Sequence, residues 1–343
     1  MRIKELKTIK YPTLKTQATV GVTAPSNGVD QGFHTLLKAS QKRLERDGFT
    51  VVIGETAWTQ VKASSATAEK RASEFQTMME NEAIDLIIPP WGGELVIEIL
   101  DKLDFSKLQL KWILGYSDLS VLLLAVTLKT GMATAQGPNL LERRGQSSDE
   151  TTARWKEVLS TKEGGTIVQY ASKRYQKYWR HDAPTPWVFH LTEPTKWKTI
   201  TGSDVEIEGR LLGGCIDVIR HLVGTPYGDV ATFLAQFSKG EPVIWHFEAY
   251  DMDNTALRRS LVQMRYAGWF DHCAGVLFGR GRNNAVYDYQ LTDVYRELAE
   301  ELNVPIVYDI DCGHFPPQMT LINGAVAKVV VKDNEKSLTQ LLI

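Results

Sequence analysis

Two stretches of the chain decide its fold: IDLIIPPWGG at residues 84–93 and WILGYSDLSVLLLAVTLK at residues 112–129. Each begins with a short apolar run that is typical of a buried strand and then breaks at glycine or proline. Apolar residues at helical spacing follow both breaks and predict helices at residues 95–103 and 119–129. Successive strand-to-helix units of this kind predict a parallel sheet that is covered by helices.

The same alternation extends in both directions from these stretches. Further strands are predicted at residues 18–23, 49–53, 242–247, 274–278 and 305–310. Further helices are predicted at residues 31–47, 66–81, 255–267 and 291–302. Residues 209–224 are expected to form a glycine-rich turn that opens a helix at Cys215, and residues 320–331 a hairpin that turns at Asn323-Gly324.

Residues 164–204 interrupt this pattern, because they are polar and aromatic and have no clean period. We therefore expect an α/β protein with three parts. These are an N-terminal parallel-sheet α/β domain (1–163), a linker with an inserted aromatic loop region (164–204) and a smaller C-terminal α/β domain (205–343).

Composition narrows the class of protein. The 343 residues carry a net charge of −2, so no global field favours nucleic acid or an anionic membrane. The cysteines (Cys215, Cys273 and Cys312) are odd in number and widely spaced, which fits neither a disulfide framework nor a zinc site. The opening segment MRIKELKTIK lacks the apolar core of a signal peptide. We expect a cytoplasmic protein without a metal or cofactor and without a nucleic-acid or membrane partner.

Ser117 lies between the strand and the helix predicted in the second stretch, at a place where parallel sheets bind ligands. The N-terminus of the following helix and nearby backbone N–H groups can stabilise an oxyanion there. The surrounding residues depart from G-x-S-x-G, because Leu119 occupies the second glycine position. A plain helix cap formed by Ser117 or Asp118 explains the pattern equally well.

Other candidate groups also follow predicted strands. Gly92 and Gly93 could donate an N–H to a developing negative charge, although an ordinary turn explains them too. His314 lies in a loop of glycine and prolines, and His246 is the competing histidine at a strand end. Glu248 could orient an imidazole, but Asp251 and Asp253 lie close in sequence and could do the same.

Taken together, these segments resemble the LD-carboxypeptidase family of serine peptidases, which includes murein LD-carboxypeptidases and microcin C immunity proteins. Five blocks carry the resemblance, and they follow the family's order over nearly the whole chain. They are GVTAPS at 21–26, WGG at 91–93 with LDF at 103–105, GYSDLS at 115–120, GRL at 209–211 with GG at 213–214, and GH at 313–314 running into residues 320–324.

The resemblance implies a Ser-Glu-His triad with Ser117 as nucleophile, Glu248 as the orienting acid and His314 as general base. It implies an oxyanion hole formed by the backbone N–H of Asp118 and that of Gly92 or Gly93. In the family, the serine lies in an N-terminal α/β domain and the other two groups lie in a C-terminal domain. A homodimer is also implied.

Two substrates compete within the family. The length of this chain and its aromatic middle segment are more similar to the microcin C immunity branch, which cuts the amide between an aminoacyl or peptidyl group and a nucleotide-like moiety. Trp179 and Trp187 are then candidates to stack on the base, or they pack the linker against the body. The alternative is a murein LD-carboxypeptidase that releases D-alanine from a muropeptide tetrapeptide.

Two alternative functions come from other classes of protein. A catalytically inactive nucleotide- or muropeptide-binding protein could share this scaffold, although all three triad residue types are present. A Rossmann-type oxidoreductase is disfavoured, because no G-x-G-x-x-G follows the first predicted strand.

Overall fold

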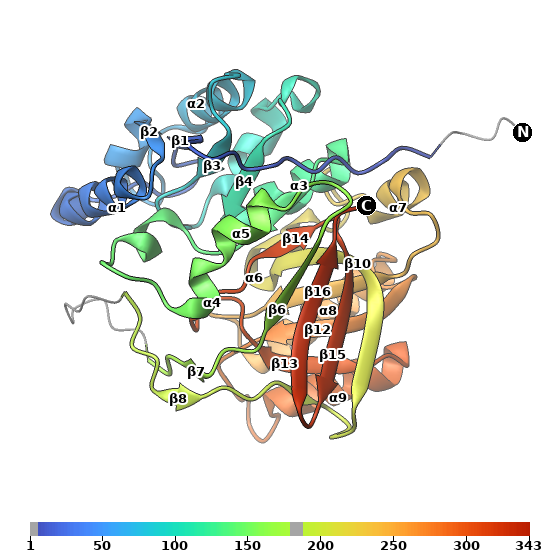
Figure 1. Ribbon diagram of the computed structural model, residues 1–343. Coiled ribbons are helices and arrows are strands. Elements are labelled where there is room, and N and C mark those ends of the chain that lie inside the picture. Colours follow the sequence, from blue (N-terminus) through green and yellow to red (C-terminus); the bar gives the residue numbers. More distant parts are fainter. Residues whose placement is uncertain (1–5, 179–187) are drawn as a thin grey trace, which may run out of the picture.

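A computed structural model describes residues 6–178 and 188–343 of the chain and confirms the predicted α/β class. Two large sheets form the upper and lower parts of the molecule in Figure 1. The upper sheet has the strand order β14-β5-β4-β3-β1-β2, and its β5, β4, β3, β1 and β2 run parallel. In that order the strands are β14 (Leu321–Asn323), β5 (Thr134–Gln136), β4 (Trp112–Gly115), β3 (Leu86–Ile88), β1 (Thr19–Val22) and β2 (Thr50–Ile53).

Helices cover the upper sheet and connect its strands. The α-helices are α1 (His34–Arg46), α2 (Ala68–Glu80), α3 (Leu119–Thr130), α4 (Glu150–Ala153) and α5 (Trp155–Ser160). The segment predicted as a helix at 95–103 is the 3-10 helix η3 (Val96–Lys102). Helix α3 is buried from Leu119 to Leu128, as its all-round apolar sequence requires. It contacts β4 and β5 of the upper sheet as well as β10 of the lower sheet, so it lies between the two.

The lower sheet has the strand order β6-β16-β15-β10-β11-β12-β13-β9. Its middle strands β10 to β13 are parallel, and antiparallel strands flank them on both sides. The strands are β6 (Thr166–Tyr170), β16 (Glu335–Leu341), β15 (Val326–Lys332), β10 (Val205–Cys215), β11 (Val243–Glu248), β12 (Cys273–Gly279), β13 (Ile306–Ile310) and β9 (Lys198–Thr199). The α-helices of this part are α6 (Ile216–Ile219), α7 (Val230–Phe237), α8 (Asn254–Tyr266) and α9 (Leu291–Leu302).

The glycine-rich turn predicted at residues 209–224 is wrong over its first half. Residues 205–215 form the long strand β10, and helix α6 begins only at Ile216. The glycines serve close packing instead. A Cβ at Gly213 would lie 1.9 Å from the carbonyl oxygen of His246, and one at Gly214 would lie 2.6 Å from the Cβ of Ser120. Side chains are excluded there because β11 and α3 approach the strand so closely.

The predicted hairpin at residues 320–331 is also wrong. Strand β14 pairs with β5 in the upper sheet, whereas β15 pairs with β10 and β16 in the lower sheet. Asn323-Gly324 is therefore the place where the chain passes from one sheet to the other. The hairpin signal failed because local turn chemistry does not reveal which sheet each arm joins.

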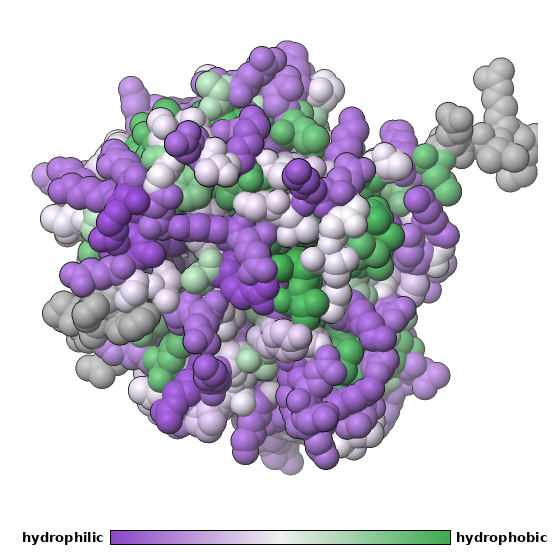
Figure 2. Space-filling view, viewed as in Figure 1, coloured by the Kyte–Doolittle hydropathy of each residue, from purple (hydrophilic) through white to green (hydrophobic). Residues whose placement is uncertain are grey.

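The aromatic middle segment contains short strands. Strand β6 forms an edge of the lower sheet, and β7 (Arg174–Tyr175) pairs with β8 (Glu193–Pro194) in a small separate ribbon at the lower left of Figure 1. Trp179 and Trp187 lie outside the described residues. The face shown in Figure 2 is mostly hydrophilic, with a smaller hydrophobic area near its middle. Within residues 6–178 and 188–343, no helix is both long and apolar enough to cross a membrane.

Arg210 joins distant parts of the fold. Its buried guanidinium donates to the carbonyl oxygens of Gly324 and Ile343 and forms an ion pair with Glu241. The hydroxyl of Tyr11, from the N-terminal part, lies 2.8 Å from each of the same two carbonyl oxygens and can donate to either. One side chain on β10 therefore holds segments from both ends of the described chain.

We expect Arg210→Leu to lower the free energy of unfolding by about 3 kcal/mol, because it removes the buried charge that pairs with Glu241 and the guanidinium hydrogen bonds to two carbonyl oxygens. Urea unfolding at neutral pH measures the change. Arg296→Leu is the matched control, since Arg296 is exposed and forms only a local ion pair with Asp293. That control should change stability by less than about 0.5 kcal/mol, and equal losses in both variants would contradict the role of Arg210.

Candidate active site

Ser117 occupies a tight turn between β4 and α3. Its φ of +64° lies in the left-handed region, which is uncommon for a residue other than glycine. Such a turn presents the serine hydroxyl above the carboxyl end of the sheet. Gly92 lies directly against it, since a Cβ on Gly92 would be 2.6 Å from the Cβ and 2.7 Å from the Oγ of Ser117. The strained serine and the adjacent glycine thus form one closely packed unit.

The carboxylate of Asp118 holds the surrounding loops in place. It is buried and accepts hydrogen bonds from the Ser26 hydroxyl at 2.5 Å and the Val96 N–H at 2.8 Å. Its side chain makes no hydrogen bond that caps α3, so the plain capping role considered for Asp118 is not observed. Among the described residues, the backbone N–H groups of Asp118, Gly92 and Gly93 donate to no acceptor. These groups are available to a ligand.

Three of the predicted residues meet in one chain of hydrogen bonds. The Nε2 atom of His314 lies 3.1 Å from the Oγ of Ser117. The Nδ1 atom of the same ring lies 2.9 and 3.0 Å from the two carboxylate oxygens of Glu248. Ser117 comes from the upper sheet, whereas Glu248 ends β11 and His314 follows β13 in the lower sheet. Packing of the two parts therefore assembles the group.

The backbone and two aromatic rings fix the imidazole of His314. Gly313 has a φ of +93°, and a Cβ there would lie 2.6 Å from a carboxylate oxygen of Glu248, so only glycine fits. The ring of Tyr250 stacks on the imidazole with a centroid distance of 4.2 Å. The ring of Tyr116 contacts it edge-on at 5.1 Å. The imidazole is therefore restricted to the plane in which it can reach both neighbours.

The pKa values of His314 and Glu248 are shifted in the directions that favour a charged pair. Burial lowers the pKa of His314, but the charge and hydrogen bond of Glu248 raise it by more, so it lies above its ordinary value. Burial raises the pKa of Glu248, but His314 and the thiol of Cys215 lower it by more, so it lies below its ordinary value. A buried carboxylate that stays ionised stabilises a proton on the imidazole beside it.

Glu142 is a further buried carboxyl at the site, and the sequence did not single it out. It accepts hydrogen bonds from the hydroxyl of Tyr116 at 2.5 Å and from the backbone N–H of Asn139 at 3.0 Å. Burial raises its pKa to about 7, although Tyr116, Asn139 and His314 act in the opposite direction. Through Tyr116, Glu142 fixes one of the rings that contact His314.

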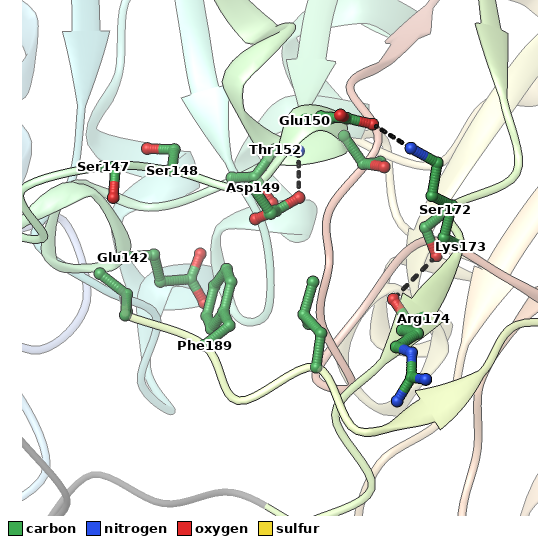
Figure 3. A pocket seen from close by; sticks show the side chains of 13 residues that line it. Glu142, Ser147, Ser148, Asp149, Glu150, Thr152, Ser172, Lys173, Arg174 and Phe189 are labelled. Carbon is green, nitrogen blue, oxygen red and sulfur yellow. Dashed lines mark hydrogen bonds and ion pairs between the residues drawn. The ribbon is translucent and has the colours of Figure 1, made fainter. Parts of the chain in front are cut away.

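Two cavities meet at Glu142. The first has a volume of about 290 Å³ and contains Ser117 and His314, with Trp91, Gly92 and Tyr250 also in its wall. The second has a volume of about 480 Å³ and is shown in Figure 3, where Glu142 and Phe189 lie on one side and Lys173 and Arg174 lie on the other. Because Glu142 lines both, a ligand longer than the first cavity has adjoining space to occupy.

The competing candidates lie elsewhere or have other partners. Asp253 caps α8 by accepting from the N–H of Ala256, Asp251 is exposed, and the ring of His246 bonds the buried amide of Asn323. Across residues 6–178 and 188–343, no group of three or more His, Cys, Asp or Glu is arranged to hold a metal ion. Tyr116, Tyr250 and Glu142 were missed, because nothing local in the sequence shows that they pack around an imidazole.

Comparison with known proteins places this geometry in a family. Residues 20–137 match the model of the LD-carboxypeptidase N-terminal domain, and residues 208–329 match that of the C-terminal domain. Together the two matches cover more than half of the chain. The chain belongs to the LD-carboxypeptidase family. This confirms the resemblance seen in the sequence, and LD-carboxypeptidases are serine peptidase-type hydrolases.

Named relatives of this chain fall in both branches of the family. It is 24% identical to the microcin C7 self-immunity protein MccF of Escherichia coli, over 87% of this chain and 86% of that protein. It is 23% identical to a protein of Bacillus subtilis described as a probable murein peptide carboxypeptidase, over 93% of this chain and 90% of that protein.

Solved structures of MccF share the fold. The inactive mutant in its apo state matches with a TM-score of 0.82 and 21% identity, covering 97% of this chain and 98% of that one. A complex of MccF with aspartyl sulfamoyl adenosine matches with a TM-score of 0.81 and 20% identity, covering 96% of this chain and 98% of that one.

We expect Gly92→Ala to slow the labelling of Ser117 by a fluorophosphonate probe while the protein stays folded, because the new methyl group would displace the hydroxyl. The rate of labelling should fall at least about 100-fold, as expected when a nucleophile is moved by about an ångström. Gly32→Ala is the matched control, since a Cβ there meets no atom within 4 Å. Labelling of Gly92→Ala at the wild-type rate would refute the close contact.

We expect the free energy of unfolding of Glu142→Gln to fall less steeply with rising pH than that of the wild type. The folded protein keeps this proton up to a pKa of about 7, whereas the unfolded chain releases it near 4.5, so stability falls as the pH rises between these values. The full effect is roughly 3 kcal/mol. Chemical denaturation between pH 4.5 and 8 compares the wild type, Glu142→Gln and the exposed control Glu163→Gln. Parallel curves for all three would contradict the assignment.

Proposed function

We propose that this hydrolase uses Ser117 as nucleophile, His314 as general base and Glu248 as the orienting acid. The hydrogen-bond chain from Ser117 Oγ through the imidazole to Glu248 is the observation that carries the proposal. Its geometry is that of a nucleophile, a base and an orienting group in sequence. The matching family supports the same roles.

In this mechanism, Nε2 of His314 accepts the proton of the Ser117 hydroxyl as Oγ attacks an amide carbonyl carbon. The resulting oxyanion accepts hydrogen bonds from the N–H of Asp118 and from that of Gly92 or Gly93. The imidazolium then gives its proton to the leaving nitrogen as the C–N bond breaks. Water, deprotonated by the same imidazole, hydrolyses the acyl-enzyme and releases Ser117.

We propose a substrate of the microcin C immunity type, in which the amide joins an aminoacyl or peptidyl group to a nucleotide-like moiety. The MccF complex with aspartyl sulfamoyl adenosine supports this choice, since that fold covers nearly all of the chain. The adjoining 480 Å³ cavity beyond Glu142 offers space for a large leaving group. Trp179 and Trp187 stay candidates for stacking on the base.

A murein LD-carboxypeptidase is the competing function, and the relative in Bacillus subtilis favours it. Both functions use the same three residues, so the substrate must be tested directly. The purified protein and Ser117→Ala are incubated separately with aminoacyl sulfamoyl-adenosine and with an L,D-linked muropeptide tetrapeptide, and mass spectrometry identifies the products.

We expect the wild type to cleave the adenosine compound and Ser117→Ala to be at least about 1,000-fold slower. Release of D-alanine alone would replace the proposed substrate by the murein one and keep the triad. Cleavage by Ser117→Ala at the wild-type rate would remove the triad as well, and no cleavage of either compound by the wild type would favour the inactive binding protein.

We also predict a shift in the pH profile of Glu248→Gln. Activity requires neutral His314, so kcat/KM rises with pH through the pKa of this histidine, which lies above 6.5 in the wild type. Without the charge of Glu248, the largest effect that raises this pKa is lost and the midpoint moves to lower pH, while the maximal rate falls by about 100- to 10,000-fold. Asp253→Asn, at the α8 cap, is the control and should keep the wild-type midpoint. An unchanged midpoint in Glu248→Gln would exclude Glu248 as the charge partner.

A further inference from the structure

A third cavity, of about 840 Å³, adjoins the catalytic one and carries a different charge. We call it the basic cavity. It shares no lining residue with the catalytic cavity, but Arg282 in its wall donates to the hydroxyl of Tyr250, which lines the catalytic cavity. Its charged lining residues are Lys177, Lys196, Lys198, Arg280 and Arg282, with Glu193 and Asp309. Cations therefore exceed carboxylates in its wall, although the chain as a whole has a net charge of −2.

Two of the five cations are held in place by ion pairs. The buried guanidinium of Arg280 pairs with the fully buried Asp311, donates to the carbonyl oxygen of Phe315 and lies over the ring of Tyr175. Lys198 pairs with Asp309 at 2.8 Å. These contacts make the inner wall of the basic cavity rigid and leave little net charge there.

The other three cations have no carboxylate partner among the described residues. Lys177 lies over the ring of Tyr178 with its Nζ 5.4 Å from the centroid. Arg282 stacks over Tyr250 at 4.4 Å and donates to its hydroxyl. Lys196 is exposed and forms no ion pair within the described part of the chain. Glu193 is the one lining carboxylate outside the ion pairs of the described residues, so the wall keeps an excess of two positive charges. Such an excess around one cavity attracts an anion that carries several charges.

The remaining lining residues suit a phosphorylated ligand. The side-chain amides of Asn283 and Asn284 each donate one hydrogen bond within the protein, and each NH₂ has a second N–H that can donate to a phosphate oxygen. The rings of Tyr178 and Phe315 offer apolar surface beside the cations. Arginine and lysine together match a multiply charged phosphate group, since arginine binds two oxygens at once and lysine acts as a point charge.

We propose that the basic cavity binds a small molecule that carries two linked phosphate groups. This site is separate from the catalytic cavity, and the inference does not rest on the proposed hydrolase function. Such phosphates belong either to free pyrophosphate or to a nucleoside diphosphate. In the second case, the base stacks on Tyr178, which is exposed at the mouth of the cavity.

Calorimetric titration of inorganic pyrophosphate into the full chain tests the site. The wild type should bind about one pyrophosphate per chain, with an affinity that falls as salt is added. Lys196→Glu should weaken binding at least ten-fold, because it turns the excess of two positive charges in the described wall into none. Lys162→Glu is the matched control, since Lys162 is exposed and lies outside the basic cavity. Thermal melting of each variant checks that it is folded.

Absence of binding to the wild type, or equal weakening in both variants, overturns the proposal. Fluorophosphonate labelling of Ser117 in the presence of saturating pyrophosphate tests the location. Labelling should continue, and a block in the wild type and in Lys196→Glu alike would place the anion in the catalytic cavity instead. A parallel titration with ADP identifies the source. Tighter binding of ADP that is lost in Tyr178→Ala indicates a nucleoside diphosphate, and equal affinity for both compounds indicates the phosphate groups alone.

Discussion

The distance of 3.1 Å between Ser117 and His314 joins residues that are 197 positions apart and belong to different sheets. A hydrogen bond weakens steeply when its atoms move by more than a few tenths of an ångström. The rest of the structure must therefore hold one sheet against the other with that precision. The contact between α3 and β10 meets this demand directly, since the hydroxyl of Ser120 accepts from the N–H of Cys215 at 3.0 Å. Ser120 lies one turn after Ser117, and Cys215 pairs with Glu248 in the register of β10 and β11.

A second link between the sheets runs through Asn323. Its backbone lies in β14, paired with β5 of the upper sheet. Its buried side chain accepts from the N–H of Gly213 in β10 and bonds the ring of His246 in β11. Burial lowers the pKa of His246 to about 4, so this ring stays neutral at physiological pH and keeps its bond to the amide. An amide suits the position because it presents a donor and an acceptor without a charge that would require a buried partner.

The sequence predicted the parts of the molecule that depend on local pattern. The βα units, the turn that carries Ser117 and the loop that carries His314 all follow from periodicity and from glycine and proline. The choice of Glu248 over Asp251 and Asp253 did not follow. That choice depends on Gly313, which leaves room for the carboxylate, and on the sheet order, in which only β12 separates β11 from β13. The long strand β10 was not predicted, for a similar reason. Its glycines are required by close packing against β11 and α3, and the sequence does not distinguish such glycines from those of a turn.

Strand β14 has a consequence for the order in which the protein forms. Synthesis on the ribosome proceeds from the N-terminus, so the other five strands of the upper sheet emerge well before residues 321–323, which complete its edge. His314 and Asn323 emerge within the same short interval. The nascent chain thus carries an unpaired sheet edge at β5 until residues 321–323 emerge, and Ser117 has no imidazole of His314 beside it until about the same time. Completion of the upper sheet and assembly of the hydrogen-bond chain around Ser117 are in this way a single late event.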